Sequence, residues 1–278
     1  LVPRRWRGRV AALITASAYL AANLVPAAWT IEDFTRPLLW VMPPGLVVLA
    51  VLAFVRLPFM QTLAQQHAQP EFAQGRYVHR ASGRLVVLIL LMFGVFFVDS
   101  LGFLRLLETP RFMESAWQAT SLDTRLILGL VHLLAALIAG ILYDALDVRA
   151  LFIWIYGIFA LTHLMYTFSI RLSGEGAPLM APILYATAVS LYTVVNFALW
   201  ADLSTPRTIS RNVALGVAVS GWTATFLSTA LAIWWQQAGL SLERHLNIVD
   251  ALAILFFLAL VAQALAPRQA AEAKGKTP

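Results

Sequence analysis

The sequence predicts an all-α, polytopic membrane protein with eight transmembrane helices. Hydrophobic residues make up 60% of the 278 residues and charged residues only 12%, whereas a typical soluble domain is about 25% charged. The mean hydropathy is +0.76. The hydrophobic residues are also concentrated in eight long runs, which are separated by shorter and more polar segments.

Each run reaches or approaches the length of about 20 apolar residues that a helix needs to cross roughly 30 Å of hydrocarbon. The runs are too long for barrel strands, and an unpaired backbone is costly in lipid, so each run is expected to be a helix. We expect the first run to be a retained helix, because no small-residue cleavage pattern follows it. The predicted spans are 10–29, 37–59, 85–107, 126–146, 150–170, 179–203, 213–235 and 249–266.

Basic residues gather in one alternating set of the gaps between these spans. Because lysine and arginine favour cytoplasmic loops, both termini are expected in the cytoplasm, and an even number of spans agrees with this. We therefore expect an integral protein of the bacterial cytoplasmic (inner) membrane, surrounded by the lipid bilayer. The net charge of +6 does not indicate nucleic acid as a partner, because the basic residues form no stripe on a soluble face. The basic set comprises Arg4, Arg5, Arg7, Arg9, Arg76, Arg80, Arg84, Arg149, Arg207, Arg211, Arg268, Lys274 and Lys276.

An internal repeat relates the first span to the seventh. A shift of 203 residues aligns Pro3-Arg4 with Pro206-Arg207 and gives eight identities in 26 positions. Alanine and leucine coincide often in membrane helices, so the shared Pro-Arg pair is the more informative part of this match.

The most specific local pattern lies between the fourth and fifth spans, at Gly140-Ile141-Leu142-Tyr143-Asp144-Ala145-Leu146-Asp147-Val148-Arg149. It resembles the loop motif of the major facilitator superfamily, Gly-x-Leu-x-Asp-x-x-Gly-Arg-Lys/Arg, which follows the second helix of each six-helix half. Asp147 and Val148 depart from that motif. The alternative is an ordinary tight turn with a carboxylate and a cytoplasmic arginine.

The resemblance implies an architecture for the whole chain. Residues 85–266 would form the C-terminal six-helix transporter bundle, and 60–84 the cytoplasmic central loop. Residues 1–59 would supply the last two helices of the N-terminal bundle, and 267–278 a cytoplasmic tail. Substrate in this fold sits between two halves near the bilayer midplane. Four of the family's usual twelve helices are missing. We expect that they lie upstream, that another membrane subunit supplies them, or that the chain no longer transports.

Five residues are candidates for the wall of a substrate cavity. Asp99 is an ionisable group inside the third span, which makes it a functional candidate. Tyr185, Tyr192, Asn196 and Trp200 follow one another at spacings that place them on one helical face. The alternatives are an Asp99 near the outer boundary, capped by Ser100 or paired with Arg105, and a polar stripe that serves only interhelical hydrogen bonds.

Six residues are candidates for a cytoplasmic gate. In the family, the motif's small glycine lets helices approach, and its aspartate and arginine form a contact that breaks as the carrier opens. That role falls on Gly140, Asp144 and Arg149. Asp202-Leu203-Ser204-Thr205-Pro206-Arg207 resembles the link between helices four and five of a half. Its acid is expected to pair with Arg207 or Arg211, or else to face water.

The chemistry of an enzyme is not indicated. The chain has no cysteine, and it contains no phosphate-binding glycine loop, nucleophile elbow or zinc-protease motif. His132 and His163 have no carboxylate at ligand spacing, so neither a metal nor a cofactor is expected.

The resemblance implies secondary transport of a small solute by alternating access, driven by the solute's own gradient or by an ion such as the proton. The alternative is a non-transporting, transporter-derived accessory or assembly subunit of a larger membrane protein complex. In that case another membrane subunit would be the partner that supplies the missing helices.

Overall fold

The computed structural model describes residues 2–24, 75–78, 83–107, 119–172, 179–205 and 207–274, together with 39–40, 42–48, 50–51 and positions 65, 69, 109 and 112. Over these residues the regular structure is helical and contains no strand, which confirms the predicted all-α class. The helices are the short η1 (Arg4–Trp6), α1 (Arg7–Leu24), α5 (Gly83–Leu107), α7 (Leu122–Ala145), α8 (Val148–Leu172), α9 (Met180–Asp202), α10 (Ile209–Gly216), the π-helical η2 (Val217–Thr223), α11 (Ala224–Gln237) and α12 (Leu242–Lys274).

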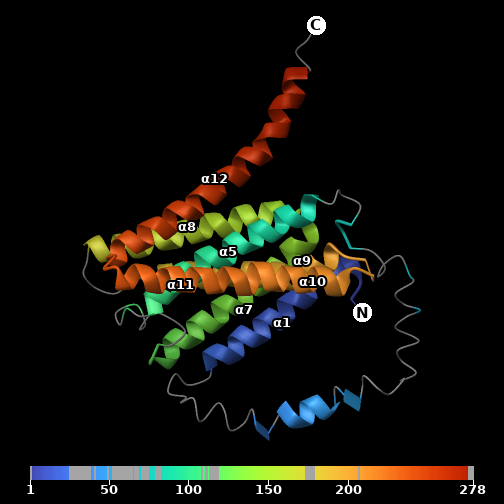
Figure 1. Ribbon diagram of the computed structural model, residues 1–278, viewed down its shortest axis with the longest axis horizontal. Coiled ribbons are helices and arrows are strands. Elements are labelled where there is room, and N and C mark those ends of the chain that lie inside the picture. The colour runs from blue at the N-terminus through green and yellow to red at the C-terminus, as the bar shows by residue number, and fades with distance from the viewer. Residues whose placement is uncertain are drawn as a thin grey trace.

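Six segments within the described residues are long and apolar enough to cross a membrane, as an integral membrane protein requires. They are Leu85–Leu106, Leu122–Ala145, Val148–Arg171, Met180–Asp202, Ile209–Gln237 and Leu242–Leu265. These segments overlap the last six predicted spans. Helices α10, η2 and α11 follow one another without a break and together form the fifth segment (Figure 1).

The first two predicted spans fall partly outside the described residues. Helix α1 covers most of the run 10–29, and the residues described between 39 and 51 are helical. In Figure 1 this second, lighter blue helix lies apart from the bundle, and Trp40 within it is 82% exposed. The eight-span arrangement and the sides on which the termini lie stay predictions, as do the domain boundaries.

Serine caps start α7 and α12 earlier than hydropathy predicts. Ser121 accepts a hydrogen bond from the backbone N–H of Thr124 (3.5 Å) and starts α7. Ser241 accepts one from the backbone N–H of Arg244 (3.3 Å) and starts α12. Serine at this position satisfies a donor that the first turn leaves free. Helix α12 also continues through Lys274 into the predicted tail 267–278.

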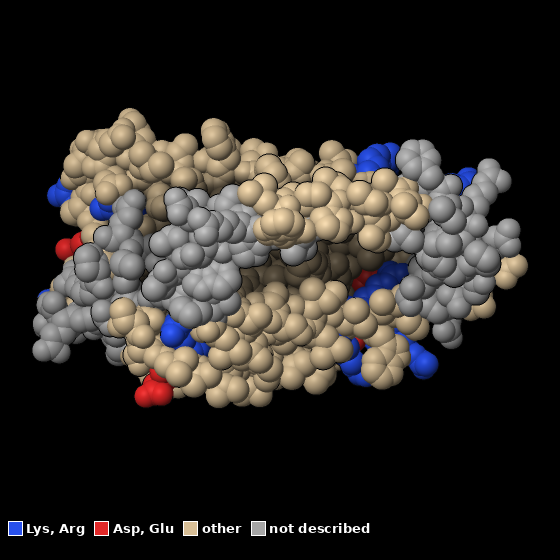
Figure 2. Space-filling view, turned by 90° about the horizontal axis from the view of Figure 1, so that it is seen from below, with Lys and Arg blue, Asp and Glu red and all other residues tan. Residues whose placement is uncertain are grey.

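The helices pack in overlapping groups. Helices α1, α7 and α9 contact one another, α8 lies against both α9 and α12, and α5 packs against η2 and α11 (Figure 1). In the face shown in Figure 2, the visible Lys, Arg, Asp and Glu side chains gather toward the two ends, and the described surface between them is uncharged. An uncharged band with charged ends is the arrangement that a bilayer favours.

Small residues bring α1 and α7 into close contact. A Cβ atom added at Gly140 would lie 2.6 Å from both the Cβ of Ala12 and the carbonyl oxygen of Gly8. One added at Gly8 would lie 2.8 Å from an oxygen of Asp144. Membrane helices approach closely where such small residues face each other. The Gly140 of the predicted gate therefore does lie at a close helix contact.

Candidate functional site

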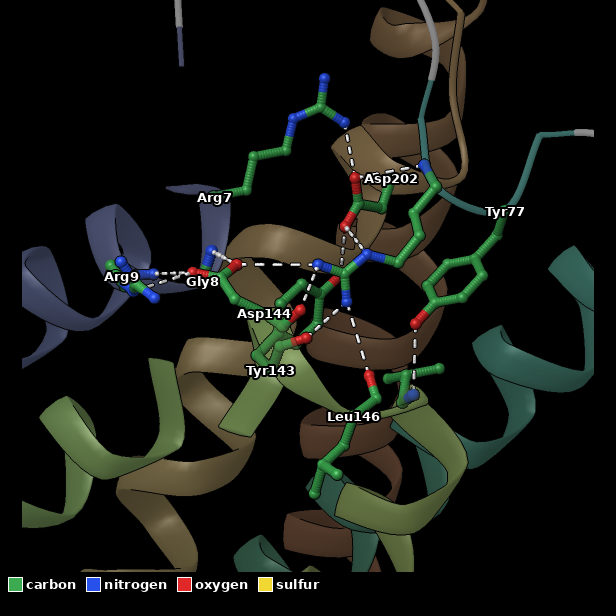
Figure 3. Close-up of polar contacts among 10 residues, drawn as sticks. Arg7, Gly8, Arg9, Tyr77, Tyr143, Asp144, Leu146 and Asp202 are labelled. Atoms are coloured by element: carbon green, nitrogen blue, oxygen red, sulfur yellow. Dashed lines mark hydrogen bonds and ion pairs between the residues drawn. The ribbon is translucent and has the colours of Figure 1, made fainter. Parts of the chain in front are cut away.

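Charged side chains from four segments meet at one end of the bundle (Figure 3). The segments are the first turn of α1, the last turns of α7 and α9, and the stretch 75–78. We call this group the arginine–aspartate cluster. Its members are Arg7, Gly8, Arg9, Arg76, Tyr77, Tyr143, Asp144 and Asp202.

Asp202 is the centre of one half of the cluster, and its side chain is fully buried. Its Oδ1 atom lies 2.6 Å from Nη1 of Arg7, and Nε of Arg76 lies 3.9 Å from its Oδ2. The phenol of Tyr143 donates a hydrogen bond to Oδ2 (3.0 Å). A buried carboxylate needs such partners, since an unpaired charge away from water is costly.

Asp144 is the centre of the other half. It accepts hydrogen bonds from the backbone N–H groups of Gly8 (2.8 Å) and Arg9 (3.2 Å). These donors belong to the first turn of α1, where backbone N–H groups have no partner within the helix and the helix dipole favours a negative charge. Nε of Arg9 and Nη2 of Arg76 lie 3.6 and 3.7 Å from its carboxylate oxygens.

The stretch 75–78 joins the two halves. The Arg76 guanidinium donates to the carbonyl oxygens of Tyr143 and Asp144, the latter at 3.1 Å, so it caps the end of α7. Burial lowers the pKa of Arg76, but the nearby Asp202 carboxylate and other neighbours raise it overall. Burial also raises the pKa of the Tyr77 phenol, whose oxygen accepts a hydrogen bond from the backbone N–H of Val148 (3.2 Å).

The structure brings together only part of the predicted gate. Asp144 and Asp202 lie in the cluster and Gly140 lies beside it, but Arg149, Arg207 and Arg211 are exposed at the surface. The pairing of Asp202 with Arg207 or Arg211 is therefore not the one observed, because Arg7 and Arg76 reach it instead. Sequence reasoning treated Arg7, Arg9 and Arg76 only as markers of orientation. Their position next to glycines, in Arg7-Gly8-Arg9 and Gly75-Arg76, was the available signal.

A cavity of about 340 Å³ lies further along the same helices. Its wall combines residues of α1 with residues of α5, α7, α8 and α9. The described lining residues are Tyr19, Ala22, Asn23, Asp99, Phe103, Leu106, Phe112, Leu128, His132, Tyr166, Pro182, Tyr185, Ala186, Val189 and Tyr192.

Asp99 enters this cavity with two tyrosines of α9. The hydroxyl of Tyr192 donates to Oδ2 of Asp99 at 2.6 Å, and the hydroxyl of Tyr185 donates to Oδ1. Ser100 instead contacts Thr225 of α11, at 3.4 Å between the two hydroxyl oxygens. The observed partners of Asp99 are thus Tyr185 and Tyr192, a pairing that was not predicted from the sequence, and not Ser100.

Helices α1 and α7 contribute other residues of the wall. The rings of Tyr19 and His132 are stacked with their centroids 4.4 Å apart. Nδ1 of His132 lies 2.8 Å from the hydroxyl oxygen of Ser190, and the Tyr19 hydroxyl lies 3.0 Å from that of Thr193. Each polar ring is therefore held in place by a hydrogen bond as well as by packing.

The remaining two cavity candidates lie elsewhere on α9. The indole N–H of Trp200 donates to Oδ1 of Asn196 (3.0 Å), and the ring packs against Gly216 of α10. Neither residue lines the cavity. The predicted polar face of α9 is thus divided, with Tyr185 and Tyr192 at the cavity and the other two residues in a helix contact near the cluster.

The described structure is that of a helical membrane protein with a largely apolar cavity that contains one carboxylate, and with a buried ionic cluster. The described residues hold no group of three or more His, Cys, Asp or Glu side chains that could bind a metal ion. No protein-family model, curated protein or solved structure matches the chain.

Proposed function

We propose that this protein carries a small solute across a membrane by the alternating-access mechanism of the major facilitator type. The observation that carries this proposal is the cavity, because its wall is shared between α1 and the six-span group that begins with α5. In the proposed architecture α1 belongs to one half of the carrier and the other helices to the second half. A cavity between halves is where this fold binds its substrate.

The size and depth of the cavity support the proposal. A volume of about 340 Å³ falls in the range of small-molecule sites. Asp99 lies 3.5 residues from the middle of the segment Leu85–Leu106, which is roughly 5 Å along the helix axis. The carboxylate is therefore close to the depth at which such carriers hold their solute.

The arginine–aspartate cluster also supports the proposal, because in a carrier it would be the gate at one end of the bundle. At about 1.5 Å per residue, Tyr19 at the cavity lies roughly 18 Å along α1 from Arg7 in the cluster. The intervening helix contact is the tight one at Gly8, Ala12 and Gly140. The passage to the cavity is therefore closed at the end of the bundle that holds the arginine–aspartate cluster. With both termini in the cytoplasm, as we propose for a protein of the bacterial inner membrane, that closed end faces the cytoplasm.

A single-cysteine experiment tests this function without knowledge of the solute, since the sequence has no cysteine. Ala186→Cys places a thiol at the cavity. In vesicles of known orientation, a membrane-impermeant maleimide should label it from the side opposite the cluster. Adding Asp144→Asn and Asp202→Asn should raise labelling from the cluster side by at least fivefold, because the gate is weakened.

The matched control is Ala232→Cys, which is buried in the core and away from the cavity. It should stay unlabelled in both backgrounds. Two outcomes would contradict alternating access. One is equal labelling of the Ala186→Cys variant from both sides, and the other is labelling that does not change when both carboxylates are removed.

The second candidate is an accessory or assembly subunit of a larger membrane complex, and the internal repeat favours it. The repeat aligns Tyr19 and Asn23, on the face of α1 that packs against α7, with Trp222 and Phe226. Trp222 and Phe226 are 77% and 73% exposed. The corresponding face of the α10–α11 span is thus open for a further helix.

A photo-reactive residue at Trp222 separates the two candidates. A cross-link to a different polypeptide is expected for a subunit of a complex, whereas a carrier that folds as one chain should give no such product. The same residue at Leu255 of α12, which is 63% exposed, is the control for contact with lipid.

A further inference from the structure

The cavity wall is unusual in its chemistry, because aromatic rings surround a single acidic group. Five helices and the described position 112 supply it. The described residues that line it include one carboxylate, Asp99, and no lysine or arginine. Arg105 and Arg125 belong to two of the same helices but are not among the lining residues. The aromatic members are Tyr19, Phe103, Phe112, Tyr166, Tyr185 and Tyr192.

The rings near Asp99 are fixed by contacts with one another. Phe103 stacks on Tyr185 with centroids 5.6 Å apart, and Phe96 meets Tyr192 edge-on at 5.1 Å. Because the two tyrosines also donate hydrogen bonds to Asp99, the carboxylate is held in one orientation. The acid and the ring faces are therefore ready for a ligand without rearrangement.

One polar atom of the wall, on Asn23, has no hydrogen-bond partner among the described residues. Asn23 is only 1% exposed, and its amide nitrogen donates to the carbonyl oxygen of Tyr19 at 2.8 Å. Its amide oxygen Oδ1 is buried and accepts no hydrogen bond in the described structure. A buried acceptor of this kind costs free energy until a donor reaches it. Asn23 lines the cavity, so a ligand that carries N–H groups would supply that donor once this side chain shifts toward it.

These features select the charge of the ligand. A cation gains from the Asp99 carboxylate and from the electron-rich faces of the aromatic rings. An anion would face Asp99 with no lysine or arginine among the described lining residues to compensate it. A sugar-like solute would leave many hydroxyl groups unpaired against a mostly apolar wall.

From this geometry we infer that the cavity binds a monovalent organic ammonium ion with an aromatic or other apolar body. The ammonium group binds the Asp99 carboxylate, with Asn23 of the same wall as a second acceptor, and the apolar body lies among the rings. This inference rests on the proposed function, since it names the class of solute that the carrier would move.

A series of three probes with one shape and different charge tests the inference. They are 2-phenylethylammonium, 2-phenylethanol and 3-phenylpropanoate, measured by calorimetry on the full chain in lipid nanodiscs at pH 7. The ammonium ion should bind at least tenfold more tightly than the alcohol, and the carboxylate should show no binding. Asp99→Asn should lower the affinity for the ammonium ion at least tenfold and remove its advantage over the alcohol.

Three further variants keep the result interpretable. Asn23→Ala should weaken binding of the ammonium ion severalfold and leave the alcohol unchanged. Tyr185→Phe keeps the carboxylate and should retain the preference for the cation, even if Asp99→Asn fails to fold. Asp250→Asn removes an acid of α12 that does not line the cavity and should change neither affinity.

The inference is overturned if the alcohol or the carboxylate binds as tightly as the ammonium ion, if Asp99→Asn binds all three probes as the unaltered chain does, or if no probe binds. These failures are separable from failure of the proposed function. If labelling of the Ala186→Cys variant still responds to loss of the cluster, the protein alternates but carries another class of solute. If neither test responds, both proposals fall.

Discussion

Asp202 and Glu243 both accept an arginine nitrogen at 2.6 Å, yet they differ sharply in exposure. The side chains of Arg7 and Asp202 are 11% and 0% exposed, whereas those of Arg171 and Glu243 are 53% and 39% exposed. Removing one partner of a buried ion pair leaves the other charge buried without a partner, which is destabilising. An exposed pair is already screened by water, so its loss costs little.

We therefore predict that Asp202→Asn lowers the free energy of unfolding by on the order of 3 kcal/mol. Glu243→Gln, with the same ion-pair distance, should change it by about 0–1 kcal/mol. Denaturant titration of the purified protein in micelles measures both values. Equal losses in the two variants would mean that the cluster is hydrated and does not form a buried contact.

The residues of the site were predictable only in part. Asp99, Tyr185 and Tyr192 could be found because an acid in an apolar span and a helical spacing are visible in the sequence. Trp200 shares that spacing, but it meets Gly216 of α10 instead of the cavity. Likewise, Asp202 pairs with Arg7 and Arg76 instead of Arg207 because of which segments of the chain meet in space.

At the scale of the helix, polarity alone misplaced the starts of α7 and α12. Charged residues such as Asp123 and Glu243 were assigned to loops, but both lie in the first helical turn after a serine cap. An acidic side chain is favoured there by the helix dipole. The capping serines were visible in the sequence, so this error was avoidable.

The motif Gly140 to Arg149 illustrates a different limit. Asp147 stands where the family's motif has glycine, and its Oδ1 atom accepts a hydrogen bond from the backbone N–H of Arg149 (3.0 Å) at the start of α8. The acid therefore caps the next helix. The tight turn is kept, but Arg149 is exposed and the partners of Asp144 come from other segments.

The contact between α1 and α7 gives a prediction at this scale. Gly140→Ala adds a methyl group 2.6 Å from the Cβ of Ala12, and overpacking of this kind costs about 1–3 kcal/mol of the free energy of unfolding. Gly221→Ala is the matched control, since nothing lies within 4 Å of its added Cβ. That change should stabilise the helix by up to about 1 kcal/mol.

Thermal unfolding in micelles measures both substitutions, and a double variant tests the cause. Adding Ala12→Gly to Gly140→Ala removes one of the two clashing atoms and should recover part of the loss. If Gly140→Ala is as stable as Gly221→Ala, the two helices do not pack as closely as the glycine contact requires.

For the whole molecule, hydropathy identified the six described spans because a bilayer imposes one length and one polarity on every segment that crosses it. How those spans pack was not visible in the same signal. The close pairing of α1 with α7, for example, depends on which small residues face each other, and hydropathy does not record the direction in which a residue faces. The hypothesis of two halves came from the resemblance and the repeat, and it stays a prediction.

The last prediction concerns orientation across the membrane. Arg5 and Arg149 are exposed near the cluster, whereas Gln237 is exposed at the far end of α11. Because the basic residues are expected on the cytoplasmic side, single cysteines at positions 5 and 149 should react with an impermeant maleimide only after cells are opened. A cysteine at position 237 should react in intact cells to near completion. The reverse pattern would refute the assigned orientation, and equal reactivity of positions 149 and 237 in intact cells would refute the assignment of α8, α9 and α11 as spans.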